Sequence, residues 1–152
     1  MKTFLLYFFA ALLALSAQAA LFKGVRPDFI FVLVFFYSLR YGQLKGAAYG
    51  AVTGLMIDLA GGFILGPNMT GKAFAGYFTA SVRQRLFRWN VLIAAFMIVI
   101  FCAIDIFLVY LCFETFTHLS FSNRPLKISI VQVVYTTLAG LILYPVLRPG
   151  NE

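Results

Sequence analysis

The chain has 152 residues, of which 62% are hydrophobic and 11% are charged, and its mean hydropathy is +0.94. A soluble domain of this size cannot bury so much apolar surface, so the composition excludes a soluble globular protein and indicates an integral membrane protein. The net charge of +7 does not indicate nucleic-acid binding. Its basic residues lie at the ends of apolar segments, where they set membrane topology and contact anionic headgroups.

The first apolar segment covers residues 3–22 and is long enough to span a bilayer. It also has features of a secretory signal peptide, because Lys2 precedes it and residues 17–19 form a small-x-small cleavage motif. The segment stays apolar through Phe22, and the chain that follows is itself rich in apolar segments. We therefore expect a retained membrane anchor.

The second segment, residues 28–39, is short. Pro27 and Asp28 suit the start of a helix, because Pro lacks an N–H that would be unpaired there and Asp faces the positive end of the helix dipole. Twelve residues of helix extend roughly 18 Å, against about 30 Å of hydrocarbon. This helix either thins the bilayer while Arg40 and Tyr41 reach the interface, or it is re-entrant.

The third segment, residues 43–61, carries a stripe of glycines that ends in Asp58. Residues four apart share one face of a helix, and a face without side chains lets another backbone approach closely in lipid. We expect Gly54 to contact the following helix, and Gly42 and Gly46 to be freer to meet another chain. The predicted helix-packing or partner-binding residues are Gly42, Gly46, Gly50 and Gly54.

Three further helices are predicted over residues 68–86, 91–116 and 127–147. The fold class is therefore all-α, with six transmembrane helices forming a single transmembrane domain over residues 1–152. Several arginines close the segment ends and predict a cytosolic basic edge, namely Arg40, Arg83, Arg85 and Arg88.

Polar residues inside the apolar segments form a predicted intramembrane cluster. Asp58 lies near the negative end of its own helix dipole, so its charge needs compensation, and Lys72 is the nearest cation along the chain. We expect these two residues to form a pair that stabilises the fold rather than a ligand or proton site. The full cluster is Asp28, Asp58, Asn68, Lys72 and Asp105.

No catalytic, metal or cofactor site is predicted. Two intramembrane aspartates, Asp58 and Asp105, suggest an aspartyl peptidase, whose carboxyl groups share a proton. Their flanking sequences lack the Asn and Arg residues that such enzymes use. The single histidine, His118, has no cysteine nearby that would complete a zinc site.

The order of several motifs resembles the MreD family of bacterial rod shape-determining proteins. The motifs are Arg26-Pro27-Asp28, then Leu39-Arg40-Tyr41-Gly42, the glycine-spaced helix ending in Asp58, Gly66-Pro67-Asn68, and Gly76-Tyr77 followed by arginines. The family positions map onto Arg26, Pro27, Asp28, Arg40, Tyr41, Gly42, Gly46, Gly50, Gly54 and Asp58, whereas Lys72 has no matching family residue.

The resemblance implies a six-helix protein of the bacterial inner membrane with both termini in the cytosol. Its fold is expected to be a compact bundle similar to the substrate-binding subunits of vitamin transporters. It implies a non-enzymatic scaffold of the cell-elongation complex that binds MreC and helps couple the actin-like MreB filament to peptidoglycan synthesis.

Charge counting leaves a rival topology open. With six spans and a cytosolic N-terminus, seven of the 12 basic residues face the cytosol. If residues 28–39 are re-entrant and the N-terminus lies outside, eight of them do. The alternative function is a small-molecule-binding subunit of a transporter, with a polar pocket near Asp58, Asn68 and Lys72.

Overall fold

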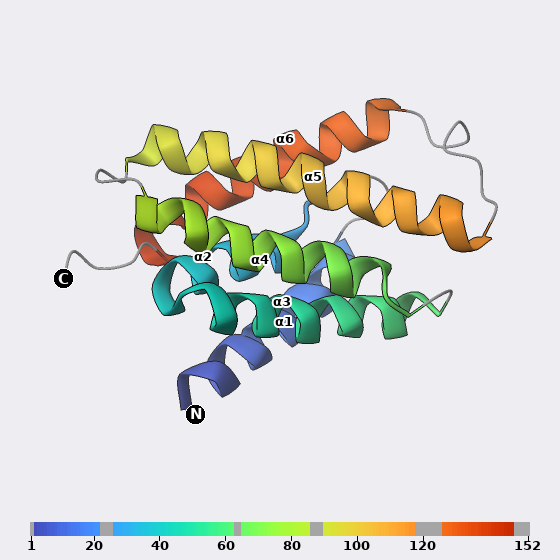
Figure 1. Cartoon of the computed structure of the whole chain (residues 1–152), viewed down its shortest axis with the longest axis horizontal. Helices are drawn as coiled ribbons and strands as arrows, with labels where there is room; N and C mark the ends of the chain where they lie inside the picture. The colour runs from blue at the N-terminus through green and yellow to red at the C-terminus, as the bar shows by residue number, and fades with distance from the viewer. Residues whose placement is uncertain (1, 22–25, 63–64, 86–89, 118–125, 148–152) are drawn as a thin grey trace.

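The computed structural model describes residues 2–21, 26–62, 65–85, 90–117 and 126–147, and over these ranges it contains helices and no strands. The predicted all-α class is confirmed, and each predicted segment forms one helix. Figure 1 shows the six helices: α1 (Lys2–Leu21), α2 (Phe29–Tyr41), α3 (Gln43–Gly61), α4 (Pro67–Arg85), α5 (Val91–Thr117) and α6 (Leu126–Leu147).

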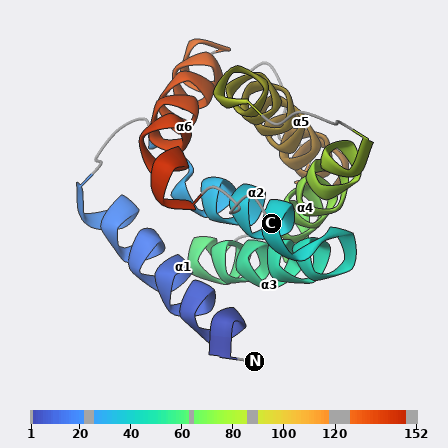
Figure 2. The same ribbon diagram turned by 90° about the vertical axis from the view of Figure 1, so that its left-hand side faces the viewer.

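The short helix α2 lies at the centre of the bundle (Figure 2). All ten of its residues from Ile30 to Leu39 are buried, since α1, α3, α4, α5 and α6 all contact it. A helix that is apolar all round is suited to such a position. One core cluster joins α2 to α4 and α5 around Phe35, and a second joins α2 to α1 and α3 around Tyr37.

Both ends of α2 are fixed by local chemistry. Asp28 caps the first turn, because its Oδ1 accepts a hydrogen bond of 2.8 Å from the Phe31 N–H. Gly42 ends the helix with a φ of +89°, a conformation that favours glycine, and its N–H donates to the Ser38 carbonyl at 3.0 Å. The chain reverses there directly into α3.

Helix α2 covers only part of the length of the bundle, because the Asp28 N–H at its start donates to Thr136 in the middle of α6. It starts beside the end of α1, where Gln18 donates a hydrogen bond to the Pro27 carbonyl. It finishes beside the start of α1, where the Tyr7 and Tyr41 rings lie 6.2 Å apart.

Helices α3 and α4 are antiparallel and approach through glycine. A Cβ built on Gly50 would lie 2.6 Å from the Lys72 carbonyl carbon, and one on Gly54 would lie 2.6 Å from that of Asn68. A Cβ on Gly46 would lie 2.8 Å from the Gly76 carbonyl oxygen. These contacts leave no room for side chains, so the two backbones pack directly against each other.

Two expectations about the stripe need correction. Gly46 is buried inside the molecule against α4, so it is not free to meet another chain. Gly42 does not belong to the packing surface, since a Cβ there would meet nothing within 4 Å. Gly42 fits the four-residue spacing of the stripe, but α3 begins one residue later, at Gln43. Gly42 therefore lies in the turn between α2 and α3 and not on the face of α3 that packs against α4.

Within the described ranges, three helices are long and apolar enough to cross a membrane by themselves: α1, α5 and α6. Helix α2 is apolar but short, and α3 and α4 are less apolar. Part of the reason is visible in the packing, because Gly50, Asp58 and Lys72, which lower the hydropathy of α3 and α4, are buried inside the bundle. Their outward faces still carry apolar side chains such as Leu59 and Phe78.

Candidate functional site: a buried ion-pair centre and two polar pockets

Lys72 is the centre of a buried group of charges contributed by three elements. Its Nζ donates to Asp28 Oδ2 at 2.7 Å and to Asp105 Oδ2 at 3.0 Å, and its side chain is 1% exposed. Asp28 precedes α2, Lys72 lies on α4 and Asp105 lies on α5. The Asp28–Lys72–Asp105 triad therefore ties these helices together, because breaking any one contact leaves a buried charge unpaired.

The prediction that Asp58 pairs with Lys72 is wrong, because Asp58 is bound by the start of α4. Its carboxylate accepts hydrogen bonds from the backbone N–H groups of Gly66 at 2.9 Å, Asn68 at 3.1 Å and Met69 at 3.1 Å. It also accepts one from Asn68 Nδ2 at 2.8 Å. Asp58 is at the negative end of α3 but at the positive end of α4, which supplies the compensation that was expected from lysine.

Gly71 makes the triad sterically possible. A Cβ at this position would overlap Asp105 Oδ1, so the absence of a side chain lets that carboxylate approach the α4 backbone. Asp105 Oδ1 is itself buried and has no hydrogen-bond partner among the described residues. The triad also holds two carboxylates for one ammonium, so it carries an excess of negative charge when all three groups are ionised.

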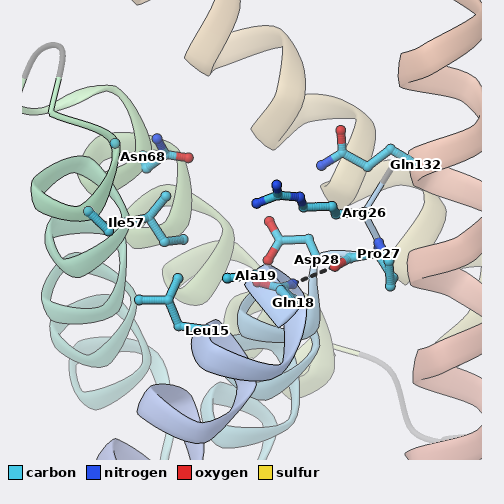
Figure 3. Close-up of a pocket in the computed structure, with 11 residues that line it drawn as sticks. Leu15, Gln18, Ala19, Arg26, Pro27, Asp28, Ile57, Asn68 and Gln132 are labelled. Atoms are coloured by element: carbon cyan, nitrogen blue, oxygen red, sulfur yellow. Dashed lines mark hydrogen bonds between the residues drawn. The ribbon is translucent and has the colours of Figure 1, made fainter. Parts of the chain in front are cut away.

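A pocket of about 370 Å³ lies against the triad, and we call it the large polar pocket. Figure 3 shows Arg26 extending into it near Asp28, with Gln132 on one side and Ile57 and Asn68 on the other. Helices α1, α3, α4 and α6 and the segment before α2 all contribute to its wall. Its lining residues are Leu15, Gln18, Ala19, Arg26, Pro27, Asp28, Ile57, Ala60, Gly61, Asn68 and Gln132.

A second cavity of about 130 Å³, the small polar pocket, lies on the α5 side of the same carboxylates. Asp105 and Tyr110 line it, and three residues line both pockets: Asp28, Asn68 and Gln132. The pockets are therefore adjacent, and both reach the negatively charged triad.

The structure divides the predicted polar cluster into two groups: the triad, and Asp58 with Asn68. The aspartates named for a peptidase, Asp58 and Asp105, contact different residues. Of the predicted basic edge, Arg40, Arg83 and Arg85 lie at the end of the bundle where α2 and α4 finish, and Gln43 and Gln84 form a hydrogen bond of 3.1 Å there. Arg88 lies outside the described residues.

Sequence reasoning missed the amides Gln18 and Gln132 as site residues. Each is an amide inside an otherwise apolar segment, and that isolation was a usable signal because a polar group in a membrane span needs a partner or a cavity. The Thr136 hydroxyl was missed too, and it accepts a hydrogen bond of 2.9 Å from the Asp28 N–H, which ties α6 to the site.

Comparison with known proteins gives one match. The family model described as rod shape-determining protein MreD matches residues 1–149. No curated protein and no solved structure matches the chain. Because the family match covers essentially the whole chain, and the apolar helices suit repeated membrane crossing, this multi-pass membrane protein belongs to the MreD family of rod shape-determining proteins.

Proposed function

We propose that this protein is a non-enzymatic scaffold of the bacterial cell-elongation machinery. In this role it binds the membrane anchor of an MreC-like partner and, through that partner, helps couple the MreB filament to peptidoglycan synthesis. The whole chain acts as one transmembrane domain of the inner membrane.

The observation that supports a scaffold most directly is that the buried charged residues join helices to one another. Lys72 and Asp105 join helices α4 and α5, and Asp58 joins the end of α3 to the start of α4. Polar groups inside a membrane protein often mark a reaction or transport path. Here the contacts of these three residues hold helices together, which is what a rigid binding platform needs.

The arrangement of helix ends favours both termini on one side of the membrane. The start of α1 lies beside the start of α3, with the Phe4 and Tyr49 rings 6.0 Å apart. The end of α6 lies beside the end of α2, where the Phe36 and Tyr144 rings are 6.1 Å apart. Arg40, Arg83 and Arg85 belong to this same end, so we propose that it faces the cytosol.

We propose the groove between α5 and α6 as the partner's binding surface. This α5–α6 groove has a volume of about 540 Å³ and an apolar lining with small and hydroxyl side chains, including Ala103, Ser129 and Thr137. Such residues let a transmembrane helix approach closely. The glycine stripe is not available for this contact, because α4 already covers Gly46, Gly50 and Gly54.

The test is a pull-down in which the Ala103→Phe variant is co-expressed with the MreC-like partner, and the amount of partner recovered with it is measured. A phenyl ring in the groove should lower partner recovery about tenfold, since overpacking of a contact typically costs ~1–3 kcal/mol. Ala139→Phe, on the other side of α6, is the matched control. Normal partner recovery and normal rod-shaped growth with Ala103→Phe would show that the partner binds elsewhere.

A further inference from the structure

We propose that the two polar pockets and an adjoining groove bind one phospholipid whose headgroup carries a primary ammonium beside its phosphate, as in phosphatidylethanolamine. This inference does not rest on the scaffold function. It follows from three features: the charge of the triad, the position of Arg26, and an apolar groove that continues from the large polar pocket along α6.

The triad calls for a positively charged hydrogen-bond donor. Lys72 is shared by two carboxylates, and Asp105 is 3% exposed yet leaves its Oδ1 without a partner among the described residues. Two carboxylates that share one ammonium leave a negative charge without compensation, which is costly in a buried site. A primary ammonium in the small polar pocket, which Asp28 and Asp105 line, supplies the missing positive charge and can donate to Asp28, whose side chain is 13% exposed.

Arg26 provides the complementary site for an anion. It lines the large polar pocket, is exposed, and forms no ion pair with a described residue. A guanidinium binds phosphate through paired N–H groups. Because Asp28, Asn68 and Gln132 border both pockets, a headgroup with its ammonium near Asp105 and its phosphate near Arg26 occupies a continuous site.

An apolar groove of about 410 Å³, the α2–α6 groove, begins at Pro27, which also lines the large polar pocket. It continues past Phe29 and along α6 from Tyr135 to Leu143, a helical rise of about 12 Å. An acyl chain fits such a surface, whereas a water-soluble ligand of a transporter subunit makes no use of it. The groove therefore identifies a lipid as the occupant.

The site also opens toward lipid. Helices α1 and α6 both line the large polar pocket, but they do not contact each other over their described residues. Figure 2 shows them diverging on either side of α2. A phospholipid can enter sideways from the bilayer between them, with its headgroup at the level where α2 begins, beside Thr136 of α6.

The experiment measures lipid retention by native mass spectrometry. The full chain is reconstituted with equal amounts of phosphatidylethanolamine, phosphatidylcholine and phosphatidylglycerol and then released from the bilayer. We expect phosphatidylethanolamine to be retained about tenfold over phosphatidylcholine, whose quaternary ammonium has no N–H to donate, the difference expected for one charge-assisted hydrogen bond.

Three variants locate the site. Arg26→Gln removes the exposed cation, Gln132→Leu changes a residue that lines both pockets, and Ala139→Phe fills the α2–α6 groove. Each should lower the retention of phosphatidylethanolamine several-fold. Ala103→Phe, in the other groove of α6, should keep it. Because Ala103→Phe tests partner binding and Ala139→Phe tests lipid binding, the two proposals fail separately.

Equal retention of the three lipids, or preference for phosphatidylglycerol, would overturn the proposal. Retention that is unchanged in Arg26→Gln and Ala139→Phe would mean that the lipid binds elsewhere, which also overturns it. The last control is free phosphoethanolamine, which has the headgroup but no acyl chain. If it raises the thermal stability of the lipid-free protein as much as the whole lipid does, the α2–α6 groove has no role and the specific ligand is not a lipid.

Discussion

At the residue scale, two carboxylates buried in the bundle are stabilised in different ways. Asp105 shares a lysine, whereas Asp58 accepts four hydrogen bonds from the first turn of α4 and the residue before it. A carboxylate in a shared ion pair and a carboxylate capped by backbone N–H groups respond differently to substitution, which gives separate predictions for each.

Lys72→Met should strongly destabilise the protein, because it leaves Asp28 and Asp105 without a counter-ion in a buried site. Breaking a buried pair by removing one partner costs ~3–5 kcal/mol. The double variant Lys72→Met/Asp105→Asn should recover part of the loss. The measurement is the free energy of unfolding in detergent, and additive effects of these two substitutions would contradict the ion pair.

Asp58→Asn should lower stability by ~1–3 kcal/mol, since one carboxylate oxygen becomes an NH₂ group that faces backbone donors. Combined with Lys72→Met, its effect should be additive within ~0.5 kcal/mol, as expected for residues that share no contact. Glu114→Gln, at an exposed position on α5, is the control. Unchanged stability of Asp58→Asn would show that the cap contributes little.

At the element scale, the contact between α3 and α4 depends on the absence of side chains. A methyl group at Gly50 or Gly54 would overlap carbonyl groups of α4, which belong to helical backbone and have little freedom to move. The glycines are therefore a packing surface inside the molecule, and their substitution should act on folding before it acts on any partner.

Gly50→Leu should abolish the folded protein, and Gly50→Ala should lower its stability by ~1–3 kcal/mol through overpacking. Gly61→Ala is a matched control on the same helix, because a Cβ there meets nothing within 4 Å and alanine favours helix by ~1 kcal/mol. Expression level and monodispersity measure the result. Normal folding of Gly50→Leu would contradict the close approach of the two backbones.

The sequence predicted the elements far better than their contacts. Apolar length and the four-residue glycine spacing were enough to predict six helices and a close helix contact near Gly54. The partner of Asp58 was missed because distance along the chain favoured Lys72, although Gly66 and Pro67 mark a helix start that supplies free N–H groups. The triad depends on how α2, α4 and α5 cross, which no local pattern encodes.

At the scale of the whole molecule, the helix ends divide into two sets. The starts of α1 and α3 and the ends of α2, α4 and α6 share one end of the bundle. Reporter fusions at residues 1 and 152 should therefore both report the cytosol. A periplasmic N-terminus with a cytosolic C-terminus would exclude six crossings and revive the re-entrant topology for residues 28–39.

The pairing of Lys72 with Asp105 also has a consequence for biogenesis. The ribosome completes α4 before it makes α5, so newly synthesised Lys72 precedes one of its two counter-ions by 33 residues. Helices α3 and α4 are also less apolar than α1, α5 and α6. Their stable insertion must therefore wait for later helices, so that a nascent chain truncated after residue 90 should be a substrate for membrane quality-control proteases, whereas one extended past residue 117 should escape them.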